Sequence, residues 1–88
     1  MEVRLRPIAA KYLDRLNESD YSRIESALED LSKEPPKGDI EPIVGKKGHF
    51  RLRVGNFRAL YHVEDNTIFV ISIDPRGQAY KKKNRRKK

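Results

Sequence analysis

The stretch that decides the fold is HFRLRVGNFRALYHV, residues 49–63. In it, two runs of alternating apolar and polar residues flank Gly55 and Asn56. Both residues tolerate the positive φ of a two-residue hairpin turn, so the stretch predicts a β-hairpin. With this turn, Val54 lies opposite Phe57. Each residue before Val54 then lies opposite the corresponding residue after Phe57, so that Arg53 faces Arg58.

The predicted hairpin has one apolar face and one basic face, because directly opposed residues share a face of a sheet. Six apolar residues share the first face and predict a side of the core: Phe50, Leu52, Val54, Phe57, Ala59 and Tyr61. Arg51, Arg53 and Arg58 share the other face. The hairpin itself contains no acid, so it predicts a cluster of three cations that repel one another.

Length and composition restrict the class of protein. The 88 residues correspond to one small domain with a modest core. The absence of cysteine excludes a disulfide framework and a thiolate metal site. No apolar run approaches the roughly 20 residues of a membrane span, and the N-terminus lacks the apolar core of a signal peptide. We expect a cytoplasmic protein with no membrane partner.

The net charge of +7 is unevenly distributed. Residues 81–88 hold seven of the 20 basic residues and predict a basic tail, disordered when free, behind a domain of residues 1–80. Within that domain, residues 1–42 have a net charge of −3 and residues 43–80 one of +3. This asymmetry predicts a polyanionic partner on the side of the sheet.

The residues before the hairpin predict one strand and two helices. A short strand at the N-terminus alternates apolar residues with arginines and ends at Pro7. Apolar residues then recur at helical spacing over residues 8–16 and again over about 20–33. We expect the second helix to be capped by Ser22, in a capping box, or by Ser19.

Residues 35–48 are expected to form a loop that ends in Lys46 and Lys47. After the hairpin, residues 64–66 predict a turn and residues 67–73 a further strand, which is apolar on both faces and therefore central. The expected fold is α+β in the order β-α-α-β-β-β, with a helical hairpin packed on one face of a small, mainly antiparallel sheet.

The usual catalytic groups are sparse. His49 and His62 are expected to face each other across the hairpin, which fits an ordinary solvated pair better than a metal site. No glycine-rich phosphate loop opens a helix, and Ser72 has no partner base. What remains is a set of cations that match phosphate oxygens and can stabilise a pentacovalent transition state, unless they are simply exposed strand positions.

Two motifs make the sequence resemble the RelE/ParE superfamily of toxins from type II toxin–antitoxin systems, and archaeal RelE most of all. FRLRVGNFRALY, residues 50–61, resembles the family's run of alternating aromatic, basic and apolar residues around a Gly-Asn or Gly-Asp pair. DPRGQAYK, residues 74–81, resembles its closing motif and favours the RelE branch. The resemblance covers residues 1–81 and implies a RelE-like fold.

The resemblance implies a ribosome-dependent mRNA endonuclease that cuts at the ribosomal A site and inhibits translation. The implied reaction uses no metal or other cofactor: the ribose 2′-OH attacks the adjacent phosphate and leaves a 2′,3′-cyclic phosphate and a 5′-OH. The implied partners are the ribosome, mRNA and a RelB-like antitoxin. Exposed apolar strand residues, expected at Leu60, Ile68 and Val70, would suit an amphipathic acidic antitoxin segment.

The resemblance also implies roles for individual residues. Arg51 and Arg53 match a basic pair, Arg58 the arginine that holds the scissile phosphate, Arg76 an arginine near the leaving oxygen, and Tyr80 a tyrosine that stacks on a base or assists proton transfer. The best-known bacterial members have lysines in place of the basic pair. Arginine stays protonated, so the general base is left open. Residues expected to bind RNA or the ribosome are Lys46, Lys47, Lys81, Lys82, Lys83, Arg85, Arg86, Lys87 and Lys88.

Two other functions fit the same sequence. A ParE-like inhibitor would act on DNA gyrase through protein contacts, without nuclease chemistry, and shares the hairpin motif and the fold. An inactive homologue would bind only its antitoxin. The closing motif and the basic tail favour RNA over the gyrase inhibitor, although the tail could also serve solubility alone, and they do not distinguish the nuclease from the inactive homologue.

Overall fold

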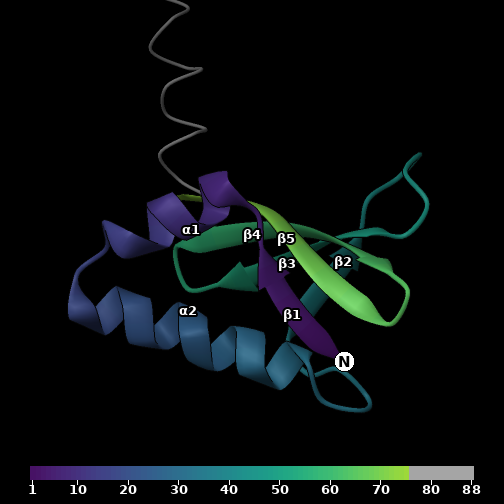
Figure 1. Ribbon diagram of the computed structural model, residues 1–88, viewed down its shortest axis with the longest axis horizontal. Helices are drawn as coiled ribbons and strands as arrows, with labels where there is room; N and C mark the ends of the chain where they lie inside the picture. Colours follow the sequence, from purple (N-terminus) through teal and green to yellow (C-terminus); the bar gives the residue numbers. More distant parts are fainter. Residues whose placement is uncertain (76–88) are drawn as a thin grey trace, which may run out of the picture.

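Two helices cover one face of a five-stranded sheet in the computed structural model, which describes residues 1–75 (Figure 1). The strand order is β1-β5-β4-β3-β2, with β1 parallel to β5 and every other pair antiparallel. This confirms the predicted α+β class. The elements are β1 (Glu2–Leu5), α1 (Pro7–Asp14), α2 (Glu18–Leu31), β2 (Asp39–Pro42), β3 (His49–Val54), β4 (Phe57–Glu64) and β5 (Thr67–Pro75).

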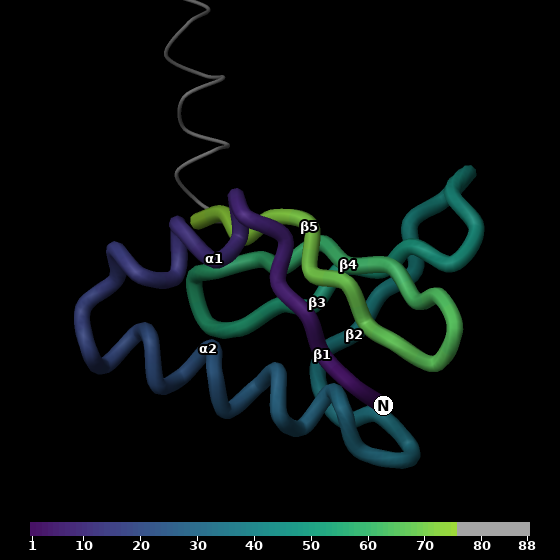
Figure 2. The backbone as a smooth tube through the Cα atoms, viewed as in Figure 1, coloured from purple at the N-terminus to yellow at the C-terminus, as the bar shows by residue number. Residues whose placement is uncertain are grey.

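The two hairpins of the sheet follow the expected turn chemistry. β3 and β4 pair with Val54 opposite Phe57, which confirms the predicted register, and Gly55 in the turn has φ +56°. In the β4–β5 turn, Asp65 and Asn66 have φ of 50° and 59°, as a type I′ turn requires at both central positions. Figure 2 shows this turn and the β2–β3 loop at the same end of the sheet.

Each helix begins at a residue suited to its first turn, and α2 alone has a side-chain cap. Pro7 opens α1, since its missing N–H costs nothing at the first helical position. The expected cap of α2 at Ser22 or Ser19 is wrong. Asn17 is extended, and its side-chain oxygen accepts a hydrogen bond from the Asp20 N–H at 2.8 Å, so α2 starts earlier than predicted. Among residues 1–75, neither helix is long and apolar enough to cross a membrane.

The core lies between the helices and the sheet. Its most buried residues are Ile24 and Leu31 on α2 and Leu52, Ile68 and Val70 on the strands. The prediction that Ile68 and Val70 are exposed is therefore wrong. Alternate side chains of β5 face the helices, and β1 and β4 flank the strand on both sides. Ile68 and Val70 are therefore only 1% and 0% exposed. Leu60, on the opposite face, is half-buried.

The predicted loop over residues 35–48 contains a strand. β2 pairs antiparallel with β3 and forms one edge of the sheet, so the observed order is β-α-α-β-β-β-β. β2 has only four residues, of which Ile40 alone is half-buried; Gly38 precedes the strand and Pro42 is its last residue. Such a segment has no apolar alternation, and it becomes a strand because the edge of β3 offers unpaired backbone groups.

Candidate functional site

The face of the sheet opposite the helices carries the predicted arginines. In the strand register, Arg53 on β3 lies opposite Arg58 on β4, which in turn lies opposite Asp74 on β5. Arg51 lies two residues before Arg53 and therefore on the same face. The structure thus brings together the three predicted arginines that lie among residues 1–75.

The arginine cluster contains acids that the sequence did not reveal. β2 places Asp39 opposite Arg53 and Glu41 opposite Arg51. Arg53 Nε donates to Asp39 Oδ2 at 3.1 Å, and Arg51 Nη1 donates to Glu41 Oε1 at 3.3 Å. The prediction of an acid-free cluster is therefore wrong, because it depends on the hairpin alone and the acids come from β2, which lies within the predicted loop.

Arg58 differs from its two neighbours. It is half-buried, and among residues 1–75 it makes no hydrogen bond or ion pair, even with Asp74 directly opposite. A guanidinium in this position offers its full set of donors to an incoming anion. Arg58 is thus the best-prepared anion ligand in the described part of the cluster.

The two β2 ion pairs do not close the site. The side chains of Arg51 and Arg53 are 34% and 43% exposed, and those of their acid partners are more exposed still. Ion pairs of this kind contribute about 0.2–1 kcal/mol each. A phosphate, which arginine binds through two parallel hydrogen bonds, can therefore displace the carboxylates.

Tyr12 on α1 supports the hairpin end of the site. Its ring packs edge to face on Phe57, with centroids 6.3 Å apart. Burial raises the pKa of Tyr12 above its ordinary value of 10.0, and the negative charges of Asp74 and Asp20 raise it further. The hydroxyl therefore stays protonated at neutral pH. In the sequence, Tyr12 is one of the residues at helical spacing over residues 8–16, and nothing there predicts this contact.

A row of rings crosses the other end of the same face. The predicted pairing of His49 with His62 is confirmed: the rings are stacked, with centroids 5.3 Å apart. His62 also stacks on Phe69 at 5.2 Å, and the guanidinium carbon of Arg6 lies 4.9 Å from the centre of the Phe69 ring. Among residues 1–75, no three His, Cys, Asp or Glu side chains gather as a metal set.

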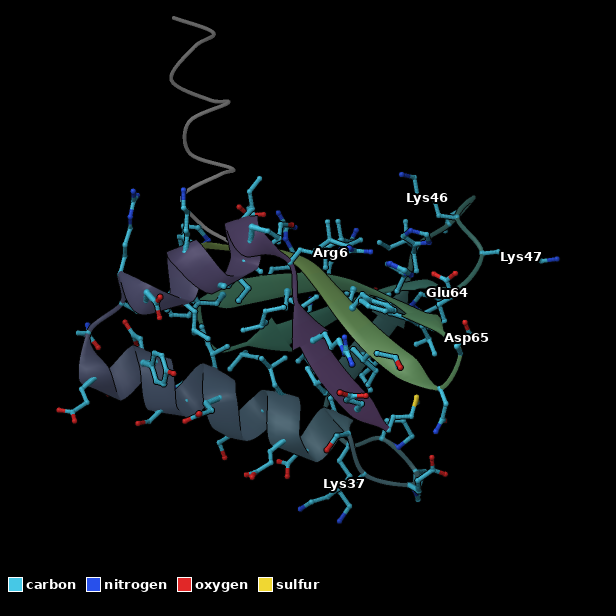
Figure 3. All side chains as sticks on the ribbon, viewed as in Figure 1. Arg6, Lys37, Lys46, Lys47, Glu64 and Asp65 are labelled. Carbon is cyan, nitrogen blue, oxygen red and sulfur yellow. The ribbon has the colours of Figure 1, made fainter. Side chains whose placement is uncertain are left out.

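The remaining predicted site residues lie apart from the arginines or beyond the described chain. Lys46 and Lys47 are exposed on the β2–β3 loop and project from its tip (Figure 3). β5 ends at Pro75, opposite Phe57 at the hairpin end. The predictions for the following residues lie outside the described residues: Arg76, Tyr80, Lys81, Lys82, Lys83, Arg85, Arg86, Lys87 and Lys88.

A comparison with protein families identifies the chain. Residues 3–80 match the model of the "ParE toxin of type II toxin-antitoxin system, parDE". The chain belongs to this toxin family. The predicted membership of the RelE/ParE superfamily is thereby confirmed, whereas no curated protein sequence matches the chain.

Solved structures of RelE toxins resemble this family member. The RelB–RelE antitoxin–toxin complex of Methanococcus jannaschii contains a chain of 25% identity and TM-score 0.72, over 89% of this chain and 95% of that one. The RelE–RelB complex of Pyrococcus horikoshii contains a chain of 27% identity and TM-score 0.74, and the match covers 88% of this chain and 96% of that one. The RelBE2 complex of Mycobacterium tuberculosis contains a chain of 30% identity and TM-score 0.68, and the match covers 85% of this chain and 96% of that one. The resemblance to archaeal RelE is thus confirmed.

Proposed function

We propose that this toxin-family member is a ribosome-dependent endoribonuclease, which cuts mRNA at the ribosomal A site and so inhibits translation. The observation that carries the proposal is Arg58, which is half-buried, has no partner among residues 1–75 and shares one sheet face with Arg51 and Arg53 of the neighbouring strand. The similarity to solved RelE structures supports the same reaction class.

The proposed reaction is an internal transfer of the phosphate. The ribose 2′-oxygen attacks the adjacent phosphorus, the bond from phosphorus to the 5′-oxygen breaks, and the products carry a 2′,3′-cyclic phosphate and a 5′-OH. Arg58 holds the non-bridging oxygens of the scissile phosphate and stabilises the extra charge of the transition state. Arg51 and Arg53 exchange their carboxylate partners for phosphate oxygens. Arg76 would lie near the leaving oxygen. Tyr80 would stack on a nucleobase of the mRNA or assist proton transfer.

The proton of the 2′-OH needs an acceptor, and the arginines cannot serve because they stay protonated. Asp39 and Glu41 are the carboxylates paired with the cluster, at 3.1 and 3.3 Å from its arginines. When a phosphate takes their place on Arg53 and Arg51, the released carboxylates lie beside the bound RNA. We assign the role of general base to one of these two residues.

An antitoxin is the second proposed partner, because the similar structures include toxin–antitoxin complexes. A groove of about 560 Å³ runs between β1 and α2, and its apolar floor includes Val3, Leu5, Leu13 and Leu28. β1 is an edge strand, so its outer backbone groups can pair with an added strand. An antitoxin segment with alternating apolar residues would suit this groove.

Cleavage on programmed ribosomes tests the proposed reaction. The wild-type protein is expected to cut ribosome-bound mRNA at the A site, to leave cyclic phosphate ends, and to spare the same mRNA free in solution. Arg58→Ala is expected to lose this activity. Arg15→Ala, which removes an exposed arginine next to α1, is the matched control and should cut normally. Normal cutting by Arg58→Ala would refute the role of Arg58.

ParE-like inhibition of DNA gyrase is the second candidate function. The observation that favours it is the family model, whose description names ParE. A supercoiling assay with purified gyrase separates the two candidates, because a nuclease of ribosome-bound mRNA has no effect on supercoiling. If the protein inhibits gyrase and leaves mRNA on the ribosome intact, the nuclease proposal is refuted and gyrase inhibition is the function.

A further inference from the structure

The row of rings at the far end of the open sheet face leads to a second site. The row runs from Phe69 on β5 through His62 on β4 to His49 on β3. One face of Phe69 lies on His62 and the other lies under the guanidinium of Arg6. Both faces of His62 are likewise covered. His49 ends the row, so its outer ring face points away from β4, toward β2 and the β2–β3 loop.

The β2–β3 loop forms a hollow beside His49. The hollow has a volume of about 510 Å³, within the range of small-molecule pockets. Pro42, Ile43 and Phe50 provide apolar walls, His49 lines it as well, and Lys46 and Lys47 lie on the loop that surrounds it. A planar ligand that entered the hollow would meet an aromatic ring, apolar walls and two cations.

Hydrogen bonds fix the shape of this hollow. The Lys46 N–H donates to the Ile43 carbonyl, and the His49 N–H donates to the Lys46 carbonyl, both at 3.2 Å. The loop is tied to β4 because the Val63 N–H donates to the Gly48 carbonyl at 3.1 Å.

The ring of His49 is oriented as well. His49 Nδ1 lies 3.0 Å from the Lys47 carbonyl oxygen, which can only accept, so Nδ1 is the donor. The hydrogen bond to the Lys47 carbonyl therefore holds the ring in one orientation, with an aromatic face available for stacking.

We infer that this hollow binds one unpaired RNA base, stacked on the outer face of His49, with Lys46 and Lys47 on the flanking phosphates. The inference rests on the proposed function, because it takes the substrate to be RNA. His49 and Arg53 lie on the same sheet face, four positions apart along β3, which is about 13 Å at 3.2–3.4 Å per residue. A few nucleotides span that distance, so the base belongs to a nucleotide near the cleaved phosphate.

Base-dependent binding is the test of this site. The wild-type chain is titrated with a short unstructured RNA and with the same RNA carrying one abasic residue, which is moved along the sequence. One abasic position is expected to weaken binding by between about 5-fold and 150-fold, the range for loss of one stacked base. His49→Ala should weaken binding of the intact RNA by a similar factor, and the affinity of this variant should no longer change when that position is abasic. His49→Phe, which retains an aromatic face, should restore the sensitivity.

The lysines provide an independent readout. Lys46→Ala with Lys47→Ala should reduce the slope of log affinity against log salt by about 0.7 for each lost phosphate contact. The matched control is Lys11→Ala with Lys37→Ala, which removes two exposed lysines elsewhere on the molecule, on α1 and in the α2–β2 loop. It should leave the base dependence intact.

Three outcomes would overturn the inference: equal binding of intact and abasic RNA, an unchanged base dependence in His49→Ala, or no RNA binding by the wild type. Cleavage on programmed ribosomes is measured separately. If the wild type cuts mRNA on the ribosome but its RNA binding does not depend on a base, only the inference about the hollow is refuted. If the wild type neither cuts nor binds RNA, the proposed function is refuted as well.

Discussion

The carboxylates of β2 are expected to have opposite effects on RNA binding and on RNA cleavage. Asp39→Asn and Glu41→Gln each remove one negative charge that lies 3.1 or 3.3 Å from an arginine, with little change of shape. In the wild type, a phosphate must displace these carboxylates. Because each exposed pair contributes about 0.2–1 kcal/mol, each substitution should tighten RNA binding by about 1.4-fold to 5-fold.

Cleavage should respond differently to the same two substitutions. The residue that accepts the 2′-OH proton contributes about 10²–10⁴-fold to the rate. One of the two variants should therefore bind RNA more tightly and cut more slowly by that factor, while the other only binds more tightly. Affinity is measured with a short single-stranded RNA at fixed salt, and the rate by single-turnover cleavage on programmed ribosomes.

A matched control makes this prediction specific to the cluster. Glu29→Gln removes an exposed acid from α2, away from the open face of the sheet, and should change neither affinity nor rate. The reasoning is refuted if Asp39→Asn and Glu41→Gln both weaken RNA binding. It is also refuted if both variants cut at the wild-type rate, because neither carboxylate would then act as the base.

Three further predictions concern single residues. Arg58→Ala should slow cleavage by about 10²–10³-fold, as expected for a lost transition-state donor, yet change the free energy of unfolding by less than about 0.5 kcal/mol in urea titrations, because Arg58 has no partner among residues 1–75. Asn17→Ala removes the 2.8 Å cap of α2 and should cost about 1 kcal/mol of stability, whereas Ser19→Ala, the cap that sequence suggested, should cost less. Burial and acidic neighbours raise the pKa of Tyr12 above 10.0, so stability should hold below pH 10 and decrease as the pH rises through the raised pKa. Tyr12→Phe should lessen that decrease, and an unchanged pH profile would contradict it.

The hairpin over residues 49–63 could be predicted to the level of individual residue pairs. Its side chains alternate with period two, and Gly55 supplies a positive φ in the turn, so register and facing were determined locally. The pairing of His49 with His62 followed directly from that register. Local pattern was sufficient here because the two strands are neighbours in sequence.

β2 could not be predicted, since its existence depends on a partner rather than on its own residues. Asp39–Pro42 contains a single half-buried apolar residue, and only the open edge of β3 makes it a strand. The consequence for the site is large, because the missed strand supplies both carboxylates of the arginine cluster. The composition gave no sign of this pairing, because acids and arginines stand ten or more positions apart in the chain.

The burial of β5 was misjudged for a related reason. The sequence predicts Ile68 and Val70 on an antitoxin surface, but β1 adds a parallel strand on the outer edge of β5 and the helices cover this face. Long-range packing of the N-terminal strand decides which apolar residues are left for a partner. The groove between β1 and α2 takes over that role in the proposed toxin–antitoxin complex.

The most direct measurement is end-mapped cleavage of mRNA on programmed ribosomes by the wild-type protein and by Arg58→Ala. The account predicts cuts at the A site with 2′,3′-cyclic phosphate ends for the wild type, and about 10²–10³-fold slower cutting for the variant. Intact mRNA in the presence of a folded wild-type protein, or equal cutting by the two proteins, would contradict it.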